Sequence, residues 1–310
     1  MVERHQRVGV LMGGLSAERE VSLKSGHAVA EALRSRGWDV VEIDVGRDLP
    51  QRLLQERVEV AWVALHGRFG EDGCVQGLLE VMGIPYTDSG VRASAVAMDK
   101  IATKRALRDL PEVVLARDAV ARRGEPLPDL PLPVITKPSV GGSTIGMTIC
   151  RTTDDLRRGL DAAFELHDEV LVEELLEGDE ITVAVLDGQA LPIVRILPDS
   201  GFFDFEAKYT KGRTRYEVPA AISGEATAKA QAAAVAAARA LGCRGLCRVD
   251  FIVRHADDQP VFLEVNTIPG MTATSLSPMA AAAMGVGFEE LVERVLLGAT
   301  CMEPEIVAVR

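Results

Sequence analysis

Two neighbouring stretches near the carboxyl end of the chain restrict its fold most strongly. Residues 247–253 and 260–266 each alternate apolar and polar side chains with a period of two, and a polar turn separates them. This pattern predicts an antiparallel hairpin with one face in the core, and a one-residue slip would bury the polar side chains. The expected core face pairs Val249, Phe251 and Val253 with Val261, Leu263 and Val265.

The other face of this hairpin would bring charged side chains together. Pairing the strands about Asp257 places Asp250 opposite Glu264 and Arg248 opposite Asn266, whereas a two-residue slip would make the two carboxylates diagonal neighbours. Like charges directly opposite each other destabilise a sheet, so a cation is expected between the two carboxylates. Carboxylate and amide oxygens suit a hard ion such as Mg²⁺. An ordinary solvated strand face with chance charges is the alternative.

The composition is typical of a large globular protein. The 310 residues are 47% hydrophobic and 26% charged, which is enough for two or three domains. The net charge of −12 argues against a general binder of nucleic acids or membrane surfaces. No apolar run approaches the ~18 residues of a membrane span, and no signal-peptide pattern opens the chain. The five scattered cysteines complete no zinc set, which favours reduced thiols in a cytoplasmic protein.

The amino-terminal segment alternates predicted strands and helices, which indicates an α/β fold with a doubly wound parallel sheet. Ligands bind such sheets at the carboxyl ends of strands, where polar loops occupy residues 13–20 and 66–73. No dinucleotide-binding G-x-G-x-x-G is present. Glu18 is either a ligand or a first-turn carboxylate favoured by the helix dipole. His66 follows a strand directly and should face the crevice.

The middle of the chain carries lysines beside a glycine hairpin. Lys100 and Lys104 share one face of a predicted helix at i, i+4, although such lysines are often solvated. Lys137 ends a predicted strand, and Gly141 and Gly142 follow at a hairpin tip whose N–H groups could turn toward an anion. The Walker pattern is absent, so a plain glycine hairpin is the alternative.

Strands are predicted next at residues 170–174 and 181–186, with a turn at residues 178–180. The glutamates of this region could simply be surface charge. The polar loop at residues 199–218 is long for a compact chain, and it is expected to be a closing lid or disordered. Residues 225–241 and 288–297 predict helices of the scaffold.

Seven motifs occur along the chain in the order GGLSAEREVSL, ALHGRFGEDG, MDK, ITKPSVGGSTIGM, DFEAKY, GLCRVDF and FLEVNTIPGMT. Together they resemble the motifs of the D-alanine–D-alanine ligase family of ATP-grasp enzymes. The resemblance covers nearly the whole chain and implies an ATP-grasp fold behind a Rossmann-like substrate-binding domain at residues 1–97. A central ATP-grasp subdomain would occupy residues 98–180. A domain for metal and substrate, with its lid, would occupy residues 181–310.

The resemblance implies that ATP phosphorylates one D-alanine and that the amine of a second D-alanine attacks the acyl phosphate. This reaction belongs to peptidoglycan synthesis in the cytoplasm, and a homodimer is expected. Two Mg²⁺ ions, or Mn²⁺, would be held by Asp250, Glu264 and Asn266. The ATP phosphates would lie against Lys100, Lys137, Gly141 and Gly142, with Lys208 at the transferred phosphate. The adenine would face Glu173 and Leu176, and the ribose would face Glu180.

The resemblance also implies roles around the two D-alanines. Glu18 would bind the ammonium group of the first, and His66 would lie near its carboxyl group. Arg248 and the Gly270 N–H would stabilise the oxyanion. The carboxylate of the second would be bound by Ser275 and the Leu276 N–H. The lid would be tied by a hydrogen-bonded set of Glu18, Ser143 and Tyr209.

Some positions differ from the commonest form of the family. Val140 and Gly141 stand where Arg-Glu is usual. Tyr209 favours a dipeptide ligase over one that joins D-alanine to D-lactate, and a D-lactate or D-serine ligase is the alternative activity. A non-catalytic nucleotide-binding homologue is disfavoured, because Arg248, Asp250, Glu264 and Asn266 are all present.

Overall fold

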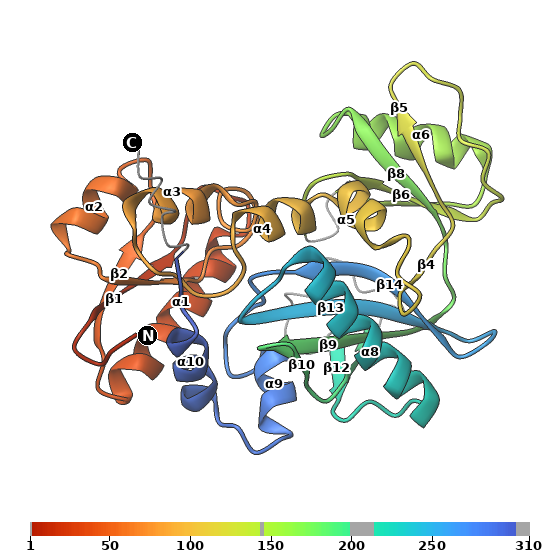
Figure 1. Cartoon of the computed structure of the whole chain (residues 1–310). Helices are drawn as coiled ribbons and strands as arrows, with labels where there is room; N and C mark the ends of the chain where they lie inside the picture. Colours follow the sequence, from red (N-terminus) through yellow and green to blue (C-terminus); the bar gives the residue numbers. More distant parts are fainter. Residues whose placement is uncertain (1, 143–145, 199–213, 302–310) are drawn as a thin grey trace, which may run out of the picture.

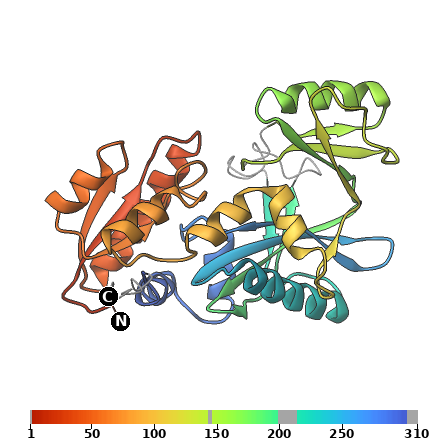
Figure 2. The same ribbon diagram turned by 45° about the horizontal axis from the view of Figure 1, so that its top comes forward.

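The computed structural model describes residues 2–142, 146–198 and 214–301 (Figure 1). Within these ranges the chain forms an amino-terminal sheet of 3 strands, a small sheet of 4 strands and a large sheet of 7 strands. The amino-terminal sheet lies at one side of the molecule, while the other two sheets lie together at the opposite side (Figure 2).

The amino-terminal sheet is parallel throughout, as the alternation of strands and helices predicts. Its strand order is β2-β1-β3, and helices cover both faces. The elements are β1 (Arg7–Met12), α1 (Arg19–Ser35), β2 (Asp39–Asp44), α2 (Leu49–Gln55), β3 (Val60–Val63) and α3 (Cys74–Met82). Beyond β3, Tyr86 forms only isolated bridges, to Ala61 and to Thr300.

The 4-stranded sheet is antiparallel, in the order β5-β8-β6-β7. Its elements are β5 (Asp118–Arg122), β6 (Val134–Pro138), β7 (Thr148–Cys150), α6 (Thr153–Phe164) and β8 (Glu169–Glu174). Helix α6 packs on one face through an apolar cluster that includes Val134 and Val172. Because side chains alternate along a strand, Lys137 and Glu173 are on the face away from α6.

The 7-stranded sheet runs β12-β11-β9-β13-β14-β4, with β10 paired to β9. Its strands are β4 (Val114–Leu115), β9 (Gly178–Leu186), β10 (Gln189–Ala190), β11 (Val194–Pro198), β12 (Thr214–Glu217), β13 (Leu246–Arg254) and β14 (Gln259–Asn266). One face of α8 (Gly224–Leu241), which is rich in alanine, is buried against β9, β13 and β14. This packing leaves the polar face of the β13–β14 hairpin for the site.

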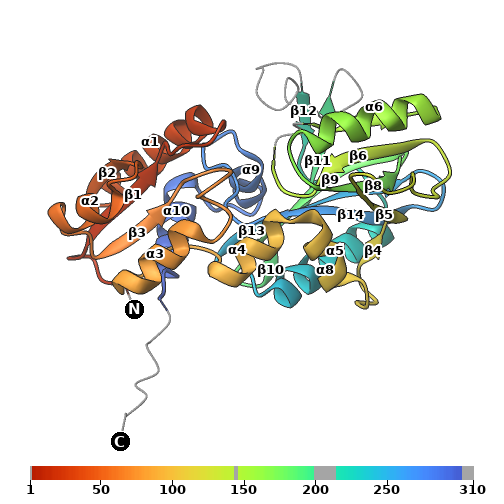
Figure 3. The same cartoon turned by 90° about the horizontal axis from the view of Figure 1, so that it is seen from above.

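The remaining helices connect the three sheets (Figure 3). They are α4 (Val91–Met98), α5 (Lys100–Leu107), α9 (Leu276–Ala282) and α10 (Phe288–Leu297). Helix α10 packs on α1, although the two are far apart in sequence. Glu293 of α10 accepts hydrogen bonds from Arg36 and Trp38, which ties the carboxyl-terminal part to the amino-terminal sheet.

The hairpin has the predicted register at its functional end and a shifted one beyond it. Asp250 pairs with Glu264 and Arg248 pairs with Asn266, but an irregularity after Asp250 then pairs Phe251 with Phe262. The prediction that Leu263 belongs to the core face is therefore wrong, because Leu263 is only half-buried while Phe262 is 0% exposed. A bulge of this kind changes which residues of a strand face the core.

The turn predicted at residues 178–180 is also wrong, because β9 begins at Gly178 and pairs along its length with β13. A Cβ atom on Gly178 would lie 2.2 Å from the Val253 carbonyl oxygen, so the glycine permits close backbone approach rather than a turn. The predicted domain limits remain predictions, although β9 runs across the one set at residue 180. No helix in the described ranges is long and apolar enough to cross a membrane.

Candidate active site

The Asp250 carboxylate is the centre of the polar face of the β13–β14 hairpin. Arg248 donates to both of its oxygens, through Nε at 2.9 Å and Nη2 at 3.0 Å. Asn266 donates from Nδ2 at 3.0 Å, and Thr182 donates from Oγ1 at 2.6 Å. Asp250 is 6% exposed, so this full set of donors compensates for its burial.

Arg248 stays charged in this environment. Burial alone would lower the pKa of Arg248, but the adjacent Asp250 carboxylate outweighs it and raises the pKa above its ordinary value. Glu264 and Glu71 also raise the pKa of Arg248. A fixed, partly buried guanidinium is therefore available beside the carboxylates of the hairpin.

The donor set fits a hard divalent cation. Asp250 and Glu264 are directly opposite each other on neighbouring strands, and Asn266 lies beside them. Lys100 Nζ lies 3.9 Å from Glu264 Oε2, so cationic side chains already balance both carboxylates. No group of three His, Cys, Asp or Glu that could hold a metal occurs in the described ranges, so the oxygen donors on this face are the two carboxylates and the neighbouring Asn266.

Lys137 and Glu173 meet on the face of the small sheet away from α6. Ile135 of β6 pairs in register with Glu173 of β8, which makes Lys137 the diagonal neighbour of Glu173. Lys137 Nζ is 2.5 Å from Glu173 Oε2, and Lys104 Nζ of α5 pairs with the other carboxylate oxygen. Burial alone would raise the pKa of Glu173, but the two ammonium groups hold it below its ordinary value.

Lys100 links the glycine hairpin to Glu264 on the polar face of the β13–β14 hairpin. Its Nζ donates to the Gly141 carbonyl oxygen at 2.5 Å, and its backbone N–H donates to the Ser139 carbonyl oxygen. Asp99 caps α5 by accepting from the backbone N–H groups of Ile101 and Ala102. This cap fixes the start of α5, so Lys100 is positioned between the small sheet and Glu264.

The two amino-terminal loops meet at Glu18 and His66. Gly67 has a positive φ of 69°, and a Cβ atom there would lie 2.7 Å from Glu18 Oε2. His66 is 8% exposed, and burial lowers its pKa against the opposing effect of Glu18, so its ring is neutral near pH 7. Burial and Glu18 raise the pKa of Glu71 to about 8.

The turn after β14 reaches the same region from the other side. The Met271 N–H donates to Ser25 Oγ at 3.2 Å, and this hydroxyl also lies 3.4 Å from His66 Nε2. Ser275 precedes Leu276, which begins α9. Ser275 Oγ accepts from the Thr272 N–H, and a Cβ atom on Gly270 would lie 3.3 Å from this oxygen, so Gly270 is close to the start of α9.

The other predicted site residues differ in how the structure places them. Gly142 lies near Glu18, since a Cβ atom on it would be 3.5 Å from Glu18 Oε2. Leu176 lies in the connection between β8 and β9, and Glu180 lies on β9 in register with Ile252. Both are half-buried. Ser143, Lys208 and Tyr209 lie outside the described residues.

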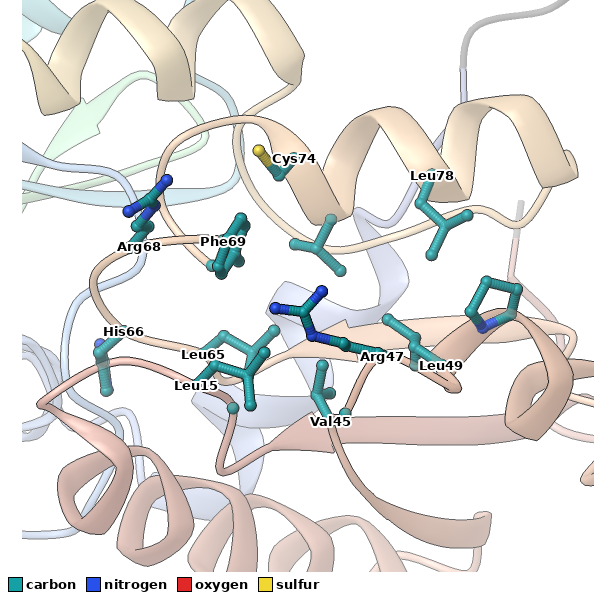
Figure 4. A pocket seen from close by; sticks show the side chains of 15 residues that line it. Leu15, Val45, Arg47, Leu49, Leu65, His66, Arg68, Phe69, Cys74 and Leu78 are labelled. Carbon is teal, nitrogen blue, oxygen red and sulfur yellow. The ribbon is translucent and has the colours of Figure 1, made fainter.

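A cavity of about 330 Å³ lies beside this polar cluster, under the loops that follow β1, β2 and β3 (Figure 4). Its walls are mainly apolar, and Leu15, Leu65 and Phe69 are among the side chains that line it. Of the predicted site residues that the structure describes, His66 alone lines it. The cavity is therefore adjacent to the polar site and distinct from it in chemistry.

Sequence reasoning missed three contributors. Thr182 is 1% exposed and lies in register with Asp250, and a hydroxyl inside an otherwise apolar strand was the available signal. Lys104 is 1% exposed although its spacing from Lys100 was equally consistent with a solvated face. Glu71 had no signal beyond its place in the polar loop after His66.

Comparisons with known proteins agree with this geometry. Residues 113–297 match the family model described as "D-ala D-ala ligase C-terminus", and residues 47–89 match "D-ala D-ala ligase N-terminus". The chain is 52% identical over 301 residues to the D-alanine–D-alanine ligase of Syntrophotalea carbinolica, covering 96% of this chain and 97% of the relative. It is 51% identical to that of Geobacter sulfurreducens, with 94% of each covered.

Solved structures give the same result. The chain superposes on the D-alanine–D-alanine ligase of Bacillus anthracis complexed with ATP with a TM-score of 0.83 and 33% identity. This match covers 94% of this chain and 97% of that one. A second structure of the Bacillus anthracis enzyme gives a TM-score of 0.84 and 35% identity over the same shares.

Proposed function

The chain belongs to the D-alanine–D-alanine ligase family of ATP-grasp enzymes, and from this premise we propose how its residues join two D-alanines with ATP. Its activity is the ligation of D-alanine to D-alanine. The observation that carries the residue assignments is the polar face of the β13–β14 hairpin. There Arg248, Asp250, Glu264 and Asn266 lie together, with Lys100 near Glu264.

In the first step, a carboxylate oxygen of the first D-alanine attacks the γ-phosphorus of ATP. A new O–P bond forms, the bond to the β-phosphate oxygen breaks, and ADP leaves. Phosphoryl transfer depends on in-line positioning and on neutralised charge. Lys100 and Lys137 supply positive charge at the phosphates, and the backbone of Gly141 and Gly142 covers them. The contact of Lys100 with Gly141 supports this grouping.

The nucleoside half of ATP would lie between the small and large sheets. Glu173 and Leu176 face the adenine, and Glu180 faces the ribose. Support comes from their positions at the end of β8, in the following connection and at the start of β9. The connection joins the two sheets, so a ligand bound against these residues would contact both.

Asp250, Glu264 and Asn266 would hold Mg²⁺, or Mn²⁺, in the loaded enzyme. A bound divalent cation neutralises phosphate charge and helps to orient the transferred group. Support comes from the oxygen donors and their direct pairing across the strands. Arg248, Thr182 and Asn266 together supply four hydrogen bonds to the Asp250 carboxylate, so one of these donors would have to move before a cation could bind there.

In the second step, the free amine of the second D-alanine attacks the carbonyl carbon of the acyl phosphate. The tetrahedral intermediate collapses with cleavage of the carbon–oxygen bond, phosphate leaves, and the attacking nitrogen loses a proton. Arg248 and the Gly270 N–H stabilise the oxyanion, and losing one such donor costs about 2.7–4 kcal/mol in other enzymes. The raised pKa of Arg248 supports this role, because the guanidinium stays charged.

The amino-terminal loops and the α9 turn hold the two D-alanines. Glu18 binds the ammonium group of the first, and neutral His66 lies near its carboxyl group as a hydrogen-bonding partner. Ser275 and the Leu276 N–H bind the carboxylate of the second. Support comes from the Ser25 hydroxyl, which links the His66 loop to the turn after β14.

The lid assignments rest on the sequence alone. Ser143 and Tyr209 would join Glu18 in a hydrogen-bonded set, and Lys208 would reach the transferred phosphate. Closing the site would exclude water, which otherwise hydrolyses the acyl phosphate. The position of Glu18 beside Gly142, next to Ser143, supports the first of these contacts.

The cellular setting follows from the reaction. D-alanyl-D-alanine is used in peptidoglycan synthesis, and ATP and D-alanine are expected in the cytoplasm. The described cysteines are all free thiols, which supports a reducing compartment. A homodimer is proposed from the family resemblance.

The test measures ADP release by the purified protein with ATP and Mg²⁺. D-alanine, L-alanine, or D-alanine with D-lactate or D-serine is added, and mass spectrometry identifies the products. ADP release that requires D-alanine and yields the dipeptide supports the proposal. A mixed product with D-lactate or D-serine would mean that the second substrate is that compound instead of D-alanine. Tight ATP binding without turnover on any D-amino acid would refute the activity.

A further inference from the structure

A buried lysine beside the nucleotide residues has no part in the steps above. Lys104 lies on α5, is 1% exposed, and is among the largest fully buried side chains of the protein. An ammonium group is very seldom buried without a partner. Here the partner is Glu173, whose two carboxylate oxygens pair separately with Lys104 and Lys137.

The three groups carry a net charge of +1 when all are ionised, since two ammonium groups share one carboxylate. The side chains of Lys104 and Glu173 are each 2% exposed, whereas that of Lys137 is 10% exposed. The more accessible lysine is therefore the one assigned to an ATP phosphate. The fully buried lysine, Lys104, pairs with the other carboxylate oxygen of Glu173.

We propose that Lys104 is a positioning residue for nucleotide binding, which keeps the Glu173 carboxylate compensated so that Lys137 can leave it for an ATP phosphate. The inference rests on the proposed nucleotide roles of Lys137 and Glu173. If Lys137 were the sole counter-ion of Glu173, its transfer to a phosphate would strand a buried carboxylate. A carboxylate buried without a partner is strongly disfavoured.

The anchoring of Lys104 supports this role. It lies one helical turn after Lys100, and the same helix begins at the Asp99 cap and contacts the glycine hairpin through the Lys100 N–H. Glu173 is on β8, the second strand of the small sheet, between β5 and β6. Lys104 therefore connects α5 to β8 through a single ion pair with Glu173.

The test compares Lys104→Met, Lys104→Arg and Lys229→Met with the wild type. Lys229 is a matched control, because it pairs with Glu225 on the exposed face of α8. Equilibrium binding of ADP without D-alanine, by calorimetry, gives a readout that does not depend on ligase activity. Steady-state assays then give kcat, and the KM values for ATP and for D-alanine.

Lys104→Met should weaken ADP binding and raise the KM for ATP by about tenfold or more, which corresponds to ~1.4 kcal/mol. The KM for D-alanine should change little, Lys104→Arg should recover most of the loss, and Lys229→Met should resemble wild type. Unchanged ADP affinity in a folded Lys104→Met protein would overturn the proposal. Wild-type protein that binds ADP but does not ligate D-alanine would refute the proposed activity and leave this binding test intact.

A double-mutant cycle separates positioning from general stability. Against a Glu173→Gln background, Lys104→Met should change ADP affinity by less than about twofold, because no carboxylate then needs compensation. An undiminished effect in that background would overturn the proposal. If Lys104→Met alone fails to fold, comparing Lys104→Arg with Lys104→Gln in the two backgrounds gives the same coupling, and a lack of coupling is again contrary to the proposal.

Discussion

Replacing Thr182 with valine would test whether the orientation of Asp250 controls metal use. The Thr182 hydroxyl donates to Asp250 Oδ1 at 2.6 Å, and both side chains are buried. Valine keeps the shape but cannot donate. A hydrogen bond to a charged group contributes about 1.5–3 kcal/mol to stability, so Thr182→Val should lower the free energy of unfolding by that amount. Groups that orient metal ligands typically affect metal affinity or activity about 10–100-fold.

The assay is ADP release as a function of Mg²⁺ concentration, with urea denaturation of the same preparations. Thr182→Val should shift the half-saturating Mg²⁺ concentration upward about 10–100-fold. Thr182→Ser keeps the hydroxyl and should retain most of the wild-type Mg²⁺ response. Thr153→Val, at an exposed position on α6, controls for the substitution itself. A wild-type Mg²⁺ dependence in folded Thr182→Val would refute the reasoning.

Three further predictions concern charge, backbone approach and pH. Asp250→Asn and Glu264→Gln should each abolish Mg²⁺-dependent ADP release, and near-normal turnover in both would contradict the metal assignment. Gly178→Ala should lower the free energy of unfolding by about 1–3 kcal/mol, because its Cβ would lie 2.2 Å from the Val253 carbonyl oxygen; an unchanged urea midpoint would count against this. Burial raises the pKa of Asp88 from 3.8 to about 7. The free energy of unfolding is therefore highest, with respect to this group, below about pH 4, where the carboxyl is protonated in both states, and it falls as the pH rises through 7. In Asp88→Asn, the fall in the free energy of unfolding between pH 4 and pH 7, measured by urea denaturation, should be smaller than in the wild type by up to ~4 kcal/mol. An equal pH dependence in both proteins would refute the assignment.

The sequence predicted the functional end of the hairpin because alternation fixes which side chains share a face. Asp250 and Glu264 share that face in every pairing frame that keeps the apolar side chains in the core, and the structure pairs them directly. It did not predict the bulge, since whether Leu263 or Phe262 enters the core depends on packing against other elements. Gly178 was taken as a turn residue because sequence alone does not show that β13 approaches its backbone.

Site residues could be predicted from the sequence where their residue type has few other roles. They were harder to predict where the fold determines which groups they contact. The resemblance to the family supplied the nucleotide and substrate roles, which composition and spacing left open. Lys104 differs, because helical spacing shows that it shares a face with Lys100 but not which neighbour covers that face. Its partner Glu173 comes from a strand far along the chain. Such a contact depends on the packing of α5 against the small sheet.

The paired charges around the site explain how one protein can be stable without ATP and still bind its phosphates. The two cations assigned to ATP within the described ranges already have oxygen partners: Lys137 pairs with Glu173, and Lys100 lies near Glu264. Binding therefore exchanges partners, and it is favourable only if each carboxylate keeps another cation. Lys104 meets this condition for Glu173, and a bound metal ion would meet it for Glu264. The same condition makes the loss of one buried lysine costlier to nucleotide binding than the loss of an exposed one.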